Sequence, residues 1–364
     1  MEPKDFTIQT KTPIWTGGIN PDKMDRVHET GLLGSLRWWY EVILRGLGAR
    51  VCDPSEHSCL LDPVKYQEGK SENMEGPALL SHAGLCAGCQ VFGATGWRRR
   101  FRLTVKEKPG VITQLKSTKS PTGDRYKENS ESKRPNWYFF GGYDKEKEFQ
   151  LKVEPLSATF DPIIVHGILR FIEQHGGLAA KTQLGYGQIR ITEPTKMDVA
   201  KFISQLNQLL PDTVTPPREL PALTNMFFAQ VKTAYQNIEA TLNLRYDVRA
   251  AFRQSIQGVK AREVRHFICG TVAKKREGSK IFYSQEVDDV MRVWGWIPDP
   301  LPNSLVEGAT RDEIVSLIHN ALKKFGSIIS WREYNSPRDM KEKNNTDKTA
   351  FLRNLLEPEP QQES

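Results

Sequence analysis

The chain has 364 residues, of which 38% are hydrophobic, and its formal net charge is +7 at pH 7. This length suits two domains of ordinary size, and the hydrophobic share is enough for a normal core, which excludes a wholly disordered chain. The sequence has neither an apolar run long enough to cross a bilayer nor a signal peptide, so we expect a cytoplasmic protein. The positive charge favours a polyanionic partner or an acidic subunit surface.

The first half of the sequence predicts six elements in the order strand, helix, strand, strand, helix, strand. Apolar residues with strand or helix spacing place these elements at residues 6–10, 30–47, 98–105, 149–153, 161–175 and 188–192. Thr30 is the expected N-cap of the first helix. Arg37, Glu41 and Arg45 lie four residues apart on the helix face opposite the apolar stripe. This order is the ferredoxin-like, or RRM-like, arrangement.

A second unit with the same order follows a linker that contains Pro211, Pro216, Pro217 and Pro221. Its predicted elements are strand 226–231, helix 242–252, strands 265–271 and 280–287, helix 310–325 and strand 327–331. The last helix has the clearest signals, because Thr310 and Glu313 form a capping box and Gly326 follows its end.

We therefore predict an α+β protein with two ferredoxin-like (βαββαβ) domains in tandem. The first domain covers residues 1–210 and the second covers residues 222–335. The first domain contains an insertion at 49–95, without helix or strand periodicity, and a flexible basic loop at 106–147. The remaining residues, 336–364, are expected to form a charged, mobile tail.

The loop between the second helix and the last strand of the first unit is rich in glycine and polar residues. Glycine lets a backbone approach a phosphate or base closely, lysine adds charge, and tyrosine can stack on a base. A dinucleotide fingerprint does not fit, because that motif follows a strand and opens a helix, whereas this loop does the reverse. We expect RNA binding, the alternative being glycines that only relieve strain in a turn. The candidate residues are Gly176, Gly177, Lys181, Thr182, Gln183, Gly185, Tyr186 and Gly187.

A basic cluster runs into the second predicted strand. Arginines that alternate along a strand face can follow phosphates, and a tryptophan beside them can stack on a base. The alternative is a solvated strand face, and we favour RNA because we expect the cluster to lie beside the glycine-rich loop. The candidates are Trp97, Arg98, Arg99, Arg100 and Arg102, with Arg37 of the first helix as an addition.

Residues 12–18, 29–40, 91–101 and 176–188 resemble the RAMP (repeat-associated mysterious protein) superfamily of CRISPR proteins. Within it, residues 6–192 are similar to a subunit at one end of type III-B (Cmr) effector complexes. The resemblance implies a non-catalytic RNA-binding and assembly subunit in a prokaryotic cytoplasm. It also implies contact with guide RNA near its 3′ end, with target RNA, or with both, and with other RAMP subunits of the Cmr complex.

Four of the five cysteines form two pairs, Cys52 with Cys59 and Cys86 with Cys89. Four thiolates can hold a closed tetrahedral zinc ion, and a metal would cross-link an insertion that has few apolar residues. His57 or His82 could replace one cysteine. The alternatives are two buried reduced pairs or a redox dithiol. The fifth cysteine, Cys269, is expected to be a buried apolar thiol.

A RAMP-family endoribonuclease is the alternative function. In related RAMP proteins the loop after the first strand can hold a catalytic aspartate or histidine, and this loop contains Asp22, Asp25, His28 and Glu29. Cleavage needs carboxylates fixed around a cation or a positioned general base, whereas an acidic loop is usually solvated. A standalone RNA-binding module is less favoured, because neither predicted sheet carries the aromatic RRM signature.

Overall fold

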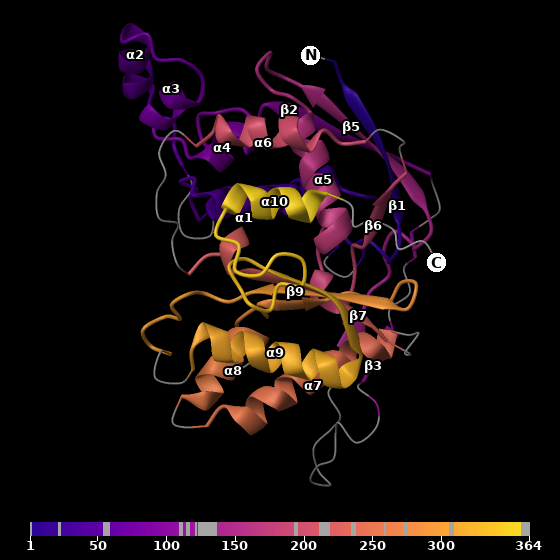
Figure 1. The fold of residues 1–364 in the computed structure, drawn as a ribbon. Helices are drawn as coiled ribbons and strands as arrows, with labels where there is room; N and C mark the ends of the chain where they lie inside the picture. The colour runs from indigo at the N-terminus through magenta and orange to yellow at the C-terminus, as the bar shows by residue number, and fades with distance from the viewer. Residues whose placement is uncertain are drawn as a thin grey trace.

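The computed structural model shows two units stacked on one another (Figure 1). Each unit contains a four-stranded antiparallel sheet, and helices cover both faces of the second sheet. The structure describes residues 2–20, 23–53, 59–108, 112–113, 117–120, 122, 137–192, 196–210, 219–233, 238–257, 260–271, 276–305 and 309–357.

The first sheet has the strand order β2-β5-β1-β6. Its strands and its two main helices are β1 (Lys4–Thr10), α1 (Glu29–Leu47), β2 (Phe101–Glu107), β5 (Glu148–Pro155), α5 (Ile163–His175) and β6 (Ile189–Ile191). Strand alternation turns Phe6 and Ile8 into the core beneath the helices, while Asp5 is exposed on the other face. The six elements predicted for this half are present in the predicted order.

The second sheet has the strand order β10-β7-β9-β8, which repeats the order of the first sheet. Its elements are β7 (Met226–Lys232), α7 (Ile238–Ser255), α8 (Ala261–Cys269), β8 (Ile281–Tyr283), β9 (Val290–Trp296), α9 (Arg311–Phe325) and β10 (Ser327–Glu333). The predicted capping box of Thr310 and Glu313 is present at the start of α9. In both sheets the fourth strand in chain order lies beside the first.

Both faces of the second sheet are buried. Phe227, Val293 and Trp331 belong to a core that this sheet forms with its own helices. Phe228 and Trp294, on the other face, belong to the core of the first unit. The sheet therefore lies between α7 to α9 on one side and helices of the first unit on the other (Figure 1).

The predicted strand at residues 265–271 is wrong, because Ala261–Cys269 forms the helix α8. Val264 and Ile268 lie four residues apart and are both fully buried, so the apolar spacing suits one helix face better than a strand. The predicted strand at 280–287 corresponds to β8, and the third strand is β9, which the sequence prediction missed.

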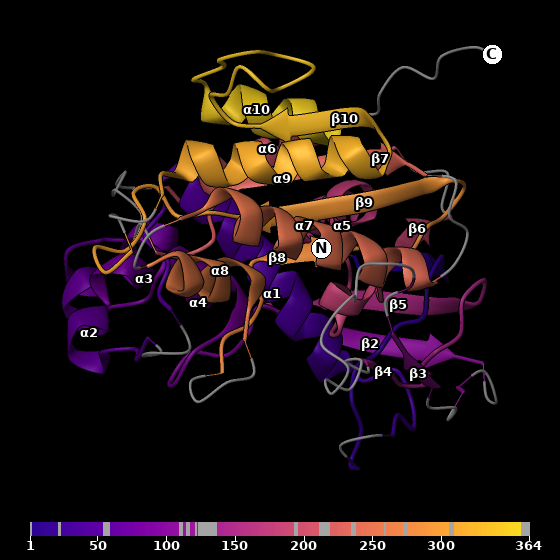
Figure 2. The same cartoon turned by 90° about the horizontal axis from the view of Figure 1, so that it is seen from below.

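The predicted mobile tail contains an ordered helix, α10 (Lys348–Leu356). Asp347 caps it by accepting hydrogen bonds from two backbone N–H groups of its first turn. Its side chains Phe351, Leu352 and Leu355 are buried in the core of the first unit, and Leu355 O bonds His175 Nε2 of α5 at 2.7 Å. The end of the chain thus returns from the second unit to the first (Figures 1 and 2).

The insertion at 49–95 contains three short helices that its lack of a long periodicity did not predict. They are α2 (Pro63–Ser71), α3 (Gly76–His82) and α4 (Ala87–Phe92). The smaller elements elsewhere are β3 (Ser117–Lys119), β4 (Trp137–Phe139), η2 (Thr182–Leu184), α6 (Val199–Asn207) and η3 (Leu223–Asn225). The helix α1 begins at Glu29 with His28 as its N-cap, so the expected cap Thr30 lies inside the first turn.

The linker prolines Pro211, Pro216 and Pro217 and half of the basic loop lie outside the described residues. Within the described part of that loop, β3 and β4 form a small antiparallel hairpin. Among the described helices, none combines the length and apolar character that a membrane span requires.

Candidate functional site

The glycines that flank the glycine-rich loop are required by packing. A Cβ on Gly176 would lie 2.2 Å from the Trp39 ring, and one on Gly187, at φ +90°, would lie 2.3 Å from the carbonyl oxygen of Leu178. The indole N–H of Trp39 also donates a hydrogen bond to Gly177 O at 3.2 Å. Gly176, Gly177, Gly185 and Gly187 are all buried. The alternative interpretation, glycines that relieve strain in a turn, fits Gly185 and Gly187, which have positive φ angles, whereas Gly176 and Gly177 leave room for neighbouring side chains.

The second unit holds the loop in place. Gly185, at φ +86°, forms a backbone bridge with Ser284. The side-chain amide of Gln188 donates a hydrogen bond to Gln285 O at 2.7 Å, and the guanidinium of Arg245 donates one to Gln183 O at 3.4 Å. The loop is therefore part of the junction between the two units.

Tyr186 cannot offer the stacking surface expected of it. Its side chain is 3% exposed, and its hydroxyl donates a short hydrogen bond to Phe140 O. Burial raises the pKa of Tyr186 to about 12, so the hydroxyl stays protonated and keeps that bond. The residue supports the loop from inside.

The accessible part of the loop is its middle, residues 179–183. Ala179 and Lys181 both adopt positive φ angles, of 71° and 60°, which side chains other than glycine rarely adopt. Backbone strain of this kind is concentrated at functional sites. The ammonium of Lys181 lies 3.6 Å from the Phe140 ring centroid and 4.7 Å from that of Trp15, so its position is defined by two aromatic rings. Thr182 and Gln183 are partly exposed beside it.

The arginine cluster lines a hollow in the first unit. Trp97, Arg98, Arg99 and Arg100 line a cavity of about 460 Å³ together with residues of α3 and the segment after β5. Arg100 donates a hydrogen bond to Thr159 Oγ1 at 3.0 Å, and Arg99 Nε donates one to Phe101 O at 2.8 Å. Arg98 is exposed, and so is Arg102 on the outer face of β2.

The expectation that this cluster lies beside the glycine-rich loop is wrong. Sheet register sets Glu107 of β2 opposite Phe149, and Ile189 of β6 opposite Thr10 of β1. The loop therefore enters the sheet at the Glu107 end, whereas Arg98, Arg99 and Arg100 precede Phe101 at the other end and Arg102 follows it directly. Six residues of strand at about 3.3 Å each separate these ends by roughly 20 Å. The two candidate surfaces are distinct.

Arg37 does not lie on an open surface, contrary to its expected place in an RNA site. Its guanidinium donates to Glu41 Oε1 at 2.7 Å and to the Sγ of Cys89 at 3.2 Å. Glu41 also pairs with Arg45 at 3.1 Å, and Glu41 and Arg45 are 3% and 2% exposed. This helix face is thus a row of paired charges against the cysteines, buried at Glu41 and Arg45 and partly exposed at Arg37. Charges are tolerated inside a protein when they are paired.

The four paired cysteines come together, as the sequence predicts. Their Sγ atoms all lie within 4.8 Å of one another. The Sγ of Cys52 lies 3.6 Å from those of Cys86 and Cys89, whereas a disulfide holds its sulfurs about 2.05 Å apart. A tetrahedral ion with Zn–S bonds of about 2.3 Å separates its sulfurs by roughly 3.8 Å. The four side chains therefore fit a closed metal site.

The start of α4 positions two of these cysteines. Cys86 is the N-cap of the helix, and its Sγ accepts a hydrogen bond from Cys89 N at 3.4 Å. Hydrogen bonds among the four thiols lower the pKa of Cys86 and Cys59 and raise that of Cys52 and Cys89, so two of the four favour the thiolate form that binds metals.

The other candidate ligands are not in this cluster. His57 lies outside the described residues, and His82 is exposed and absent from the group of cysteines. Cys269 is buried in the core of the second unit, as expected for an apolar thiol.

The loop before α1 contains one polar pair that could act in catalysis. His28 Nε2 lies 2.8 Å from Asp25 Oδ1, and this hydrogen bond lowers the pKa of Asp25. Glu29 is engaged otherwise, because it accepts bonds from Arg26 at 2.7 Å and from Val105 N at 3.3 Å. Asp22 lies outside the described residues. Within the described ranges, no cluster of carboxylates or histidines has the geometry of a metal site.

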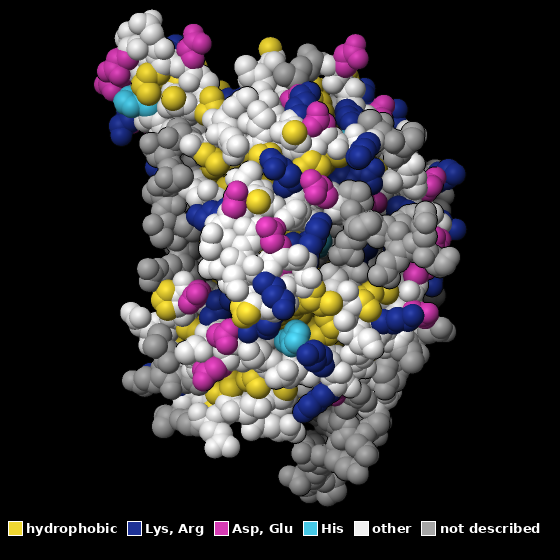
Figure 3. Space-filling view, in the orientation of Figure 1, with side chains coloured by type: hydrophobic (Ala, Val, Ile, Leu, Met, Phe, Trp, Pro, Cys, Tyr) yellow, Lys and Arg dark blue, Asp and Glu magenta, His cyan; other side chains and the backbone are white. Residues whose placement is uncertain are grey.

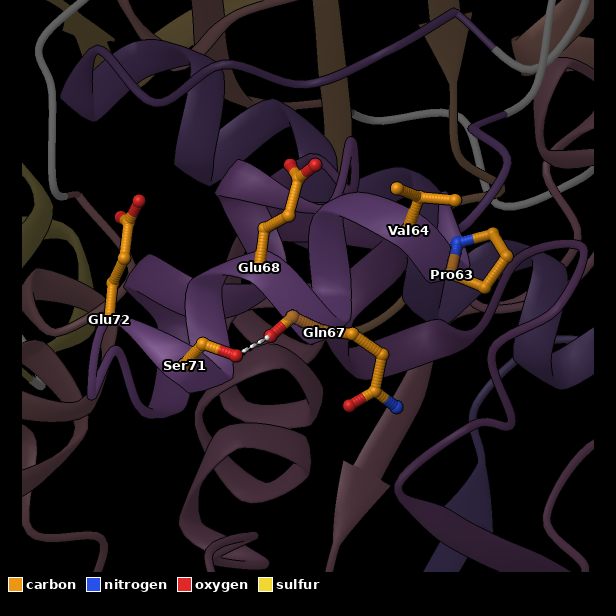
Figure 4. A pocket seen from close by; sticks show the side chains of 6 residues that line it. All are labelled: Pro63, Val64, Gln67, Glu68, Ser71 and Glu72. Atoms are coloured by element: carbon orange, nitrogen blue, oxygen red, sulfur yellow. Dashed lines mark hydrogen bonds between the residues drawn. The ribbon is translucent and has the colours of Figure 1, made fainter.

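Two surfaces carry no converging groups. On the face in Figure 3, Lys and Arg side chains are interspersed with Asp and Glu, so the positive charge is not gathered in one patch there. A shallow hollow on α2 is lined by Val64, Gln67 and Glu68 among others, and Figure 4 shows its side chains spread along one helix. The hydrogen bond drawn there, from Ser71 Oγ to Gln67 O, lies within that helix.

The sequence profile of the RAMP superfamily matches residues 7–190, so the chain belongs to this superfamily. Cmr1 from Pyrococcus furiosus has a similar structure, with 13% identity and a TM-score of 0.45 over 88% of this chain and 97% of that one. A chain of the type III-B Cmr-beta complex bound to cognate target RNA has 12% identity and a TM-score of 0.43, over 87% and 99% of the two chains. No curated protein matches the sequence.

Proposed function

We propose that this chain is a non-catalytic RNA-binding and assembly subunit of a type III-B CRISPR (Cmr) effector complex. It would contact guide RNA near its 3′ end, target RNA, or both, beside other RAMP subunits in the cytoplasm of a prokaryotic cell. Membership of the RAMP superfamily supports this, as does the resemblance of residues 12–18, 29–40 and 91–101 to such subunits. The observation that carries the proposal is the strained, accessible segment 179–183 with its lysine.

The strand order supports the proposal that both units are ferredoxin-like. In each sheet two helical connections place the fourth strand beside the first and the third beside the second. We keep the boundaries 1–210 and 222–335 for the two domains, and we add α10 to the first unit because its apolar face packs there.

The RNA contacts can be tested by removing one charge at a time. Lys181→Ala and Arg98→Ala should each weaken binding of single-stranded RNA, because each removes a cation that can neutralise a phosphate. The plot of log affinity against log salt concentration has a negative slope, and each lost phosphate contact should make this slope shallower by about 0.7. Fluorescence anisotropy titrations at several salt concentrations measure both quantities.

A matched control is Lys324→Ala, which removes the same charge from the exposed side of α9. It should change affinity and slope little. If Lys181→Ala binds RNA with unchanged affinity and slope, the glycine-rich loop is not the RNA site. Because Arg98 lies at the far end of the sheet, the two variants report on the two surfaces separately.

The cysteine cluster is proposed to hold one structural zinc ion. Its closed set of four thiolates leaves no position for a substrate, and a bound ion would cross-link Cys52 and Cys59, near the beginning of the insertion, to Cys86 and Cys89 at the start of α4. The guanidinium of Arg37 would offset part of the negative charge of the four thiolates.

Elemental analysis of the purified protein should therefore find about one zinc per chain. Cys86→Ser should lose the metal and lower the midpoint of thermal unfolding, because metal binding contributes to folding free energy. Cys269→Ser should keep the metal, since that thiol lies in the second core. A metal-free wild-type protein that unfolds at the same temperature with and without added zinc would contradict the proposal.

The second candidate function, an endoribonuclease, is favoured only by the hydrogen-bonded pair of His28 and Asp25. Cleavage also needs a group that stabilises the charge of the transition state. The nearby carboxylate of Glu29 bonds Arg26 and the backbone, and that of Glu107 accepts from Val27 N at 2.9 Å. These two carboxylates support the fold.

The purified chain should accordingly leave guide and target RNA intact, with or without Mg²⁺ or Mn²⁺. His28→Ala and Asp25→Ala should leave the RNA equally intact. Denaturing gels of end-labelled RNA provide the measurement. Site-specific cleavage by the wild type that disappears in both variants would replace the proposed function by the nuclease.

A further inference from the structure

A cavity of about 370 Å³ opens at the junction of the two units. Its walls come from the first turns of α1, from residues within 177–182 of the glycine-rich loop, and from β8 and β9 of the second unit. None of the described residues that line it is charged. The volume lies within the range of small-ligand sites.

The aromatic wall of this cavity is fixed in place before any ligand enters. The Trp38 ring stands edge-on to Trp39, with centroids 4.7 Å apart and an interplanar angle of 87°. Phe282 lies 6.3 Å from Trp38 and stacks on Trp294 at 5.6 Å, with an angle of 9°. Trp294 and Trp39 are buried, while Trp38 and Phe282 are partly exposed toward the cavity. The wall therefore offers flat apolar surface with little freedom to move.

Gly34 supplies a second, independent observation. It lies within α1, where glycine destabilises a helix relative to alanine. A Cβ at Gly34 would meet no atom within 4 Å, whereas one at Gly31 would collide with Thr16 and one at Gly46 with Leu223. Packing explains the other two glycines but not Gly34, which lines the cavity. Its missing side chain keeps the cavity open.

The polar groups of the cavity suit the edge of a neutral heterocycle. The side chains of Thr30, Ser35 and Thr182 line it, and a hydroxyl can both donate and accept. Lys181 is the only cationic residue of this loop. Its two neighbours in the sequence line the cavity, but Lys181 itself does not. A flat, uncharged group would thus enter while a phosphate attached to it stays beside the lysine.

We propose that this cavity receives one unpaired base of single-stranded RNA, turned out of the strand. Its face would lie against Trp38 and Phe282, its edge would bond the hydroxyls, and its phosphate would lie at Lys181. Unpaired RNA bases are commonly held in this way, by aromatic stacking and by hydrogen bonds to their edges. The proposal rests on the proposed function, that the glycine-rich loop binds RNA.

The test uses the purified full chain and a short single-stranded RNA in which one abasic nucleotide is moved along the strand. For the wild type, one position should be sensitive, with affinity reduced about tenfold or more, as expected from the loss of one stacked base. Gly34→Leu, which fills the cavity, should bind intact RNA as weakly as the wild type binds the sensitive abasic RNA. In this variant that abasic position should have no further effect.

Gly278→Leu is the matched control, because a Cβ there also meets no atom within 4 Å and the residue does not line the cavity. It should retain wild-type affinity and abasic sensitivity, and circular dichroism should show both variants folded. Trp38→Ala, which removes the stacking ring without filling the cavity, should reproduce the loss seen with Gly34→Leu.

The outcomes separate this proposal from the function on which it rests. If the wild type binds RNA but no abasic position matters and Gly34→Leu binds normally, the cavity is not a base site and the RNA-binding function stands. If Gly34→Leu binds RNA normally but fails to assemble with neighbouring subunits, the cavity holds a protein side chain and the proposal is overturned. If the wild type binds no RNA, both fail together.

Discussion

The packing of the second sheet against the first unit is the interaction on which the candidate site depends. Phe228 of β7 meets Phe171 of α5 edge-on at 5.6 Å and His175 at 5.1 Å; both phenylalanines are buried and His175 is partly buried. Burial lowers the pKa of His175 to about 3, so the imidazole stays neutral in this apolar environment. Because apolar burial is the main favourable term in such an interface, the two units form one body.

The junction explains the form of the glycine-rich loop. Both of its ends are fixed, one beneath Trp39 and one against Ser284 and Gln285, so its middle is held in a strained conformation that an isolated turn would relax. The second unit therefore positions a loop that belongs to the first. The helix α10 reinforces this arrangement by returning the end of the chain to the first core.

The helix α1 connects the junction with the cysteine cluster. Gly34 and Trp38 line the cavity, while Arg37 and Glu41 belong to the row of paired charges against the cysteines. Removing one partner of a buried ion pair costs about 3–5 kcal/mol of stability. A substitution of Glu41 should therefore destabilise the whole of α1. A metal at the cysteines would hold the insertion against the same element that carries the cavity.

Strong local patterns made much of the fold predictable. The stripes of α1, α5 and α9 and the alternation of β1 and β5 are long enough to identify each element, and the capping box marks the start of α9. The helix α8 is hard to predict because its nine residues also suit a strand, and α10 because it is short and follows a run of charged residues.

The candidate site was harder to predict, for a physical reason. The cysteine spacing pointed to a metal directly, because ligands must converge on one ion. A glycine needed for packing against Trp39 looks the same in sequence as one that leaves room for a ligand, and only the neighbouring atoms distinguish Gly176 from Gly34. The distance between the arginines and the loop follows from sheet register, which no local pattern encodes.

We propose that RNA lies at the junction of the two units. Photocrosslinking of the purified chain to single-stranded RNA that carries thiouridine, followed by mass spectrometry of the linked peptides, tests it most directly. We expect crosslinks to the peptides that contain Trp38 and the segment 179–183. Crosslinks confined to other surfaces, such as α2 or the outer side of α9, with none at the junction, would contradict it.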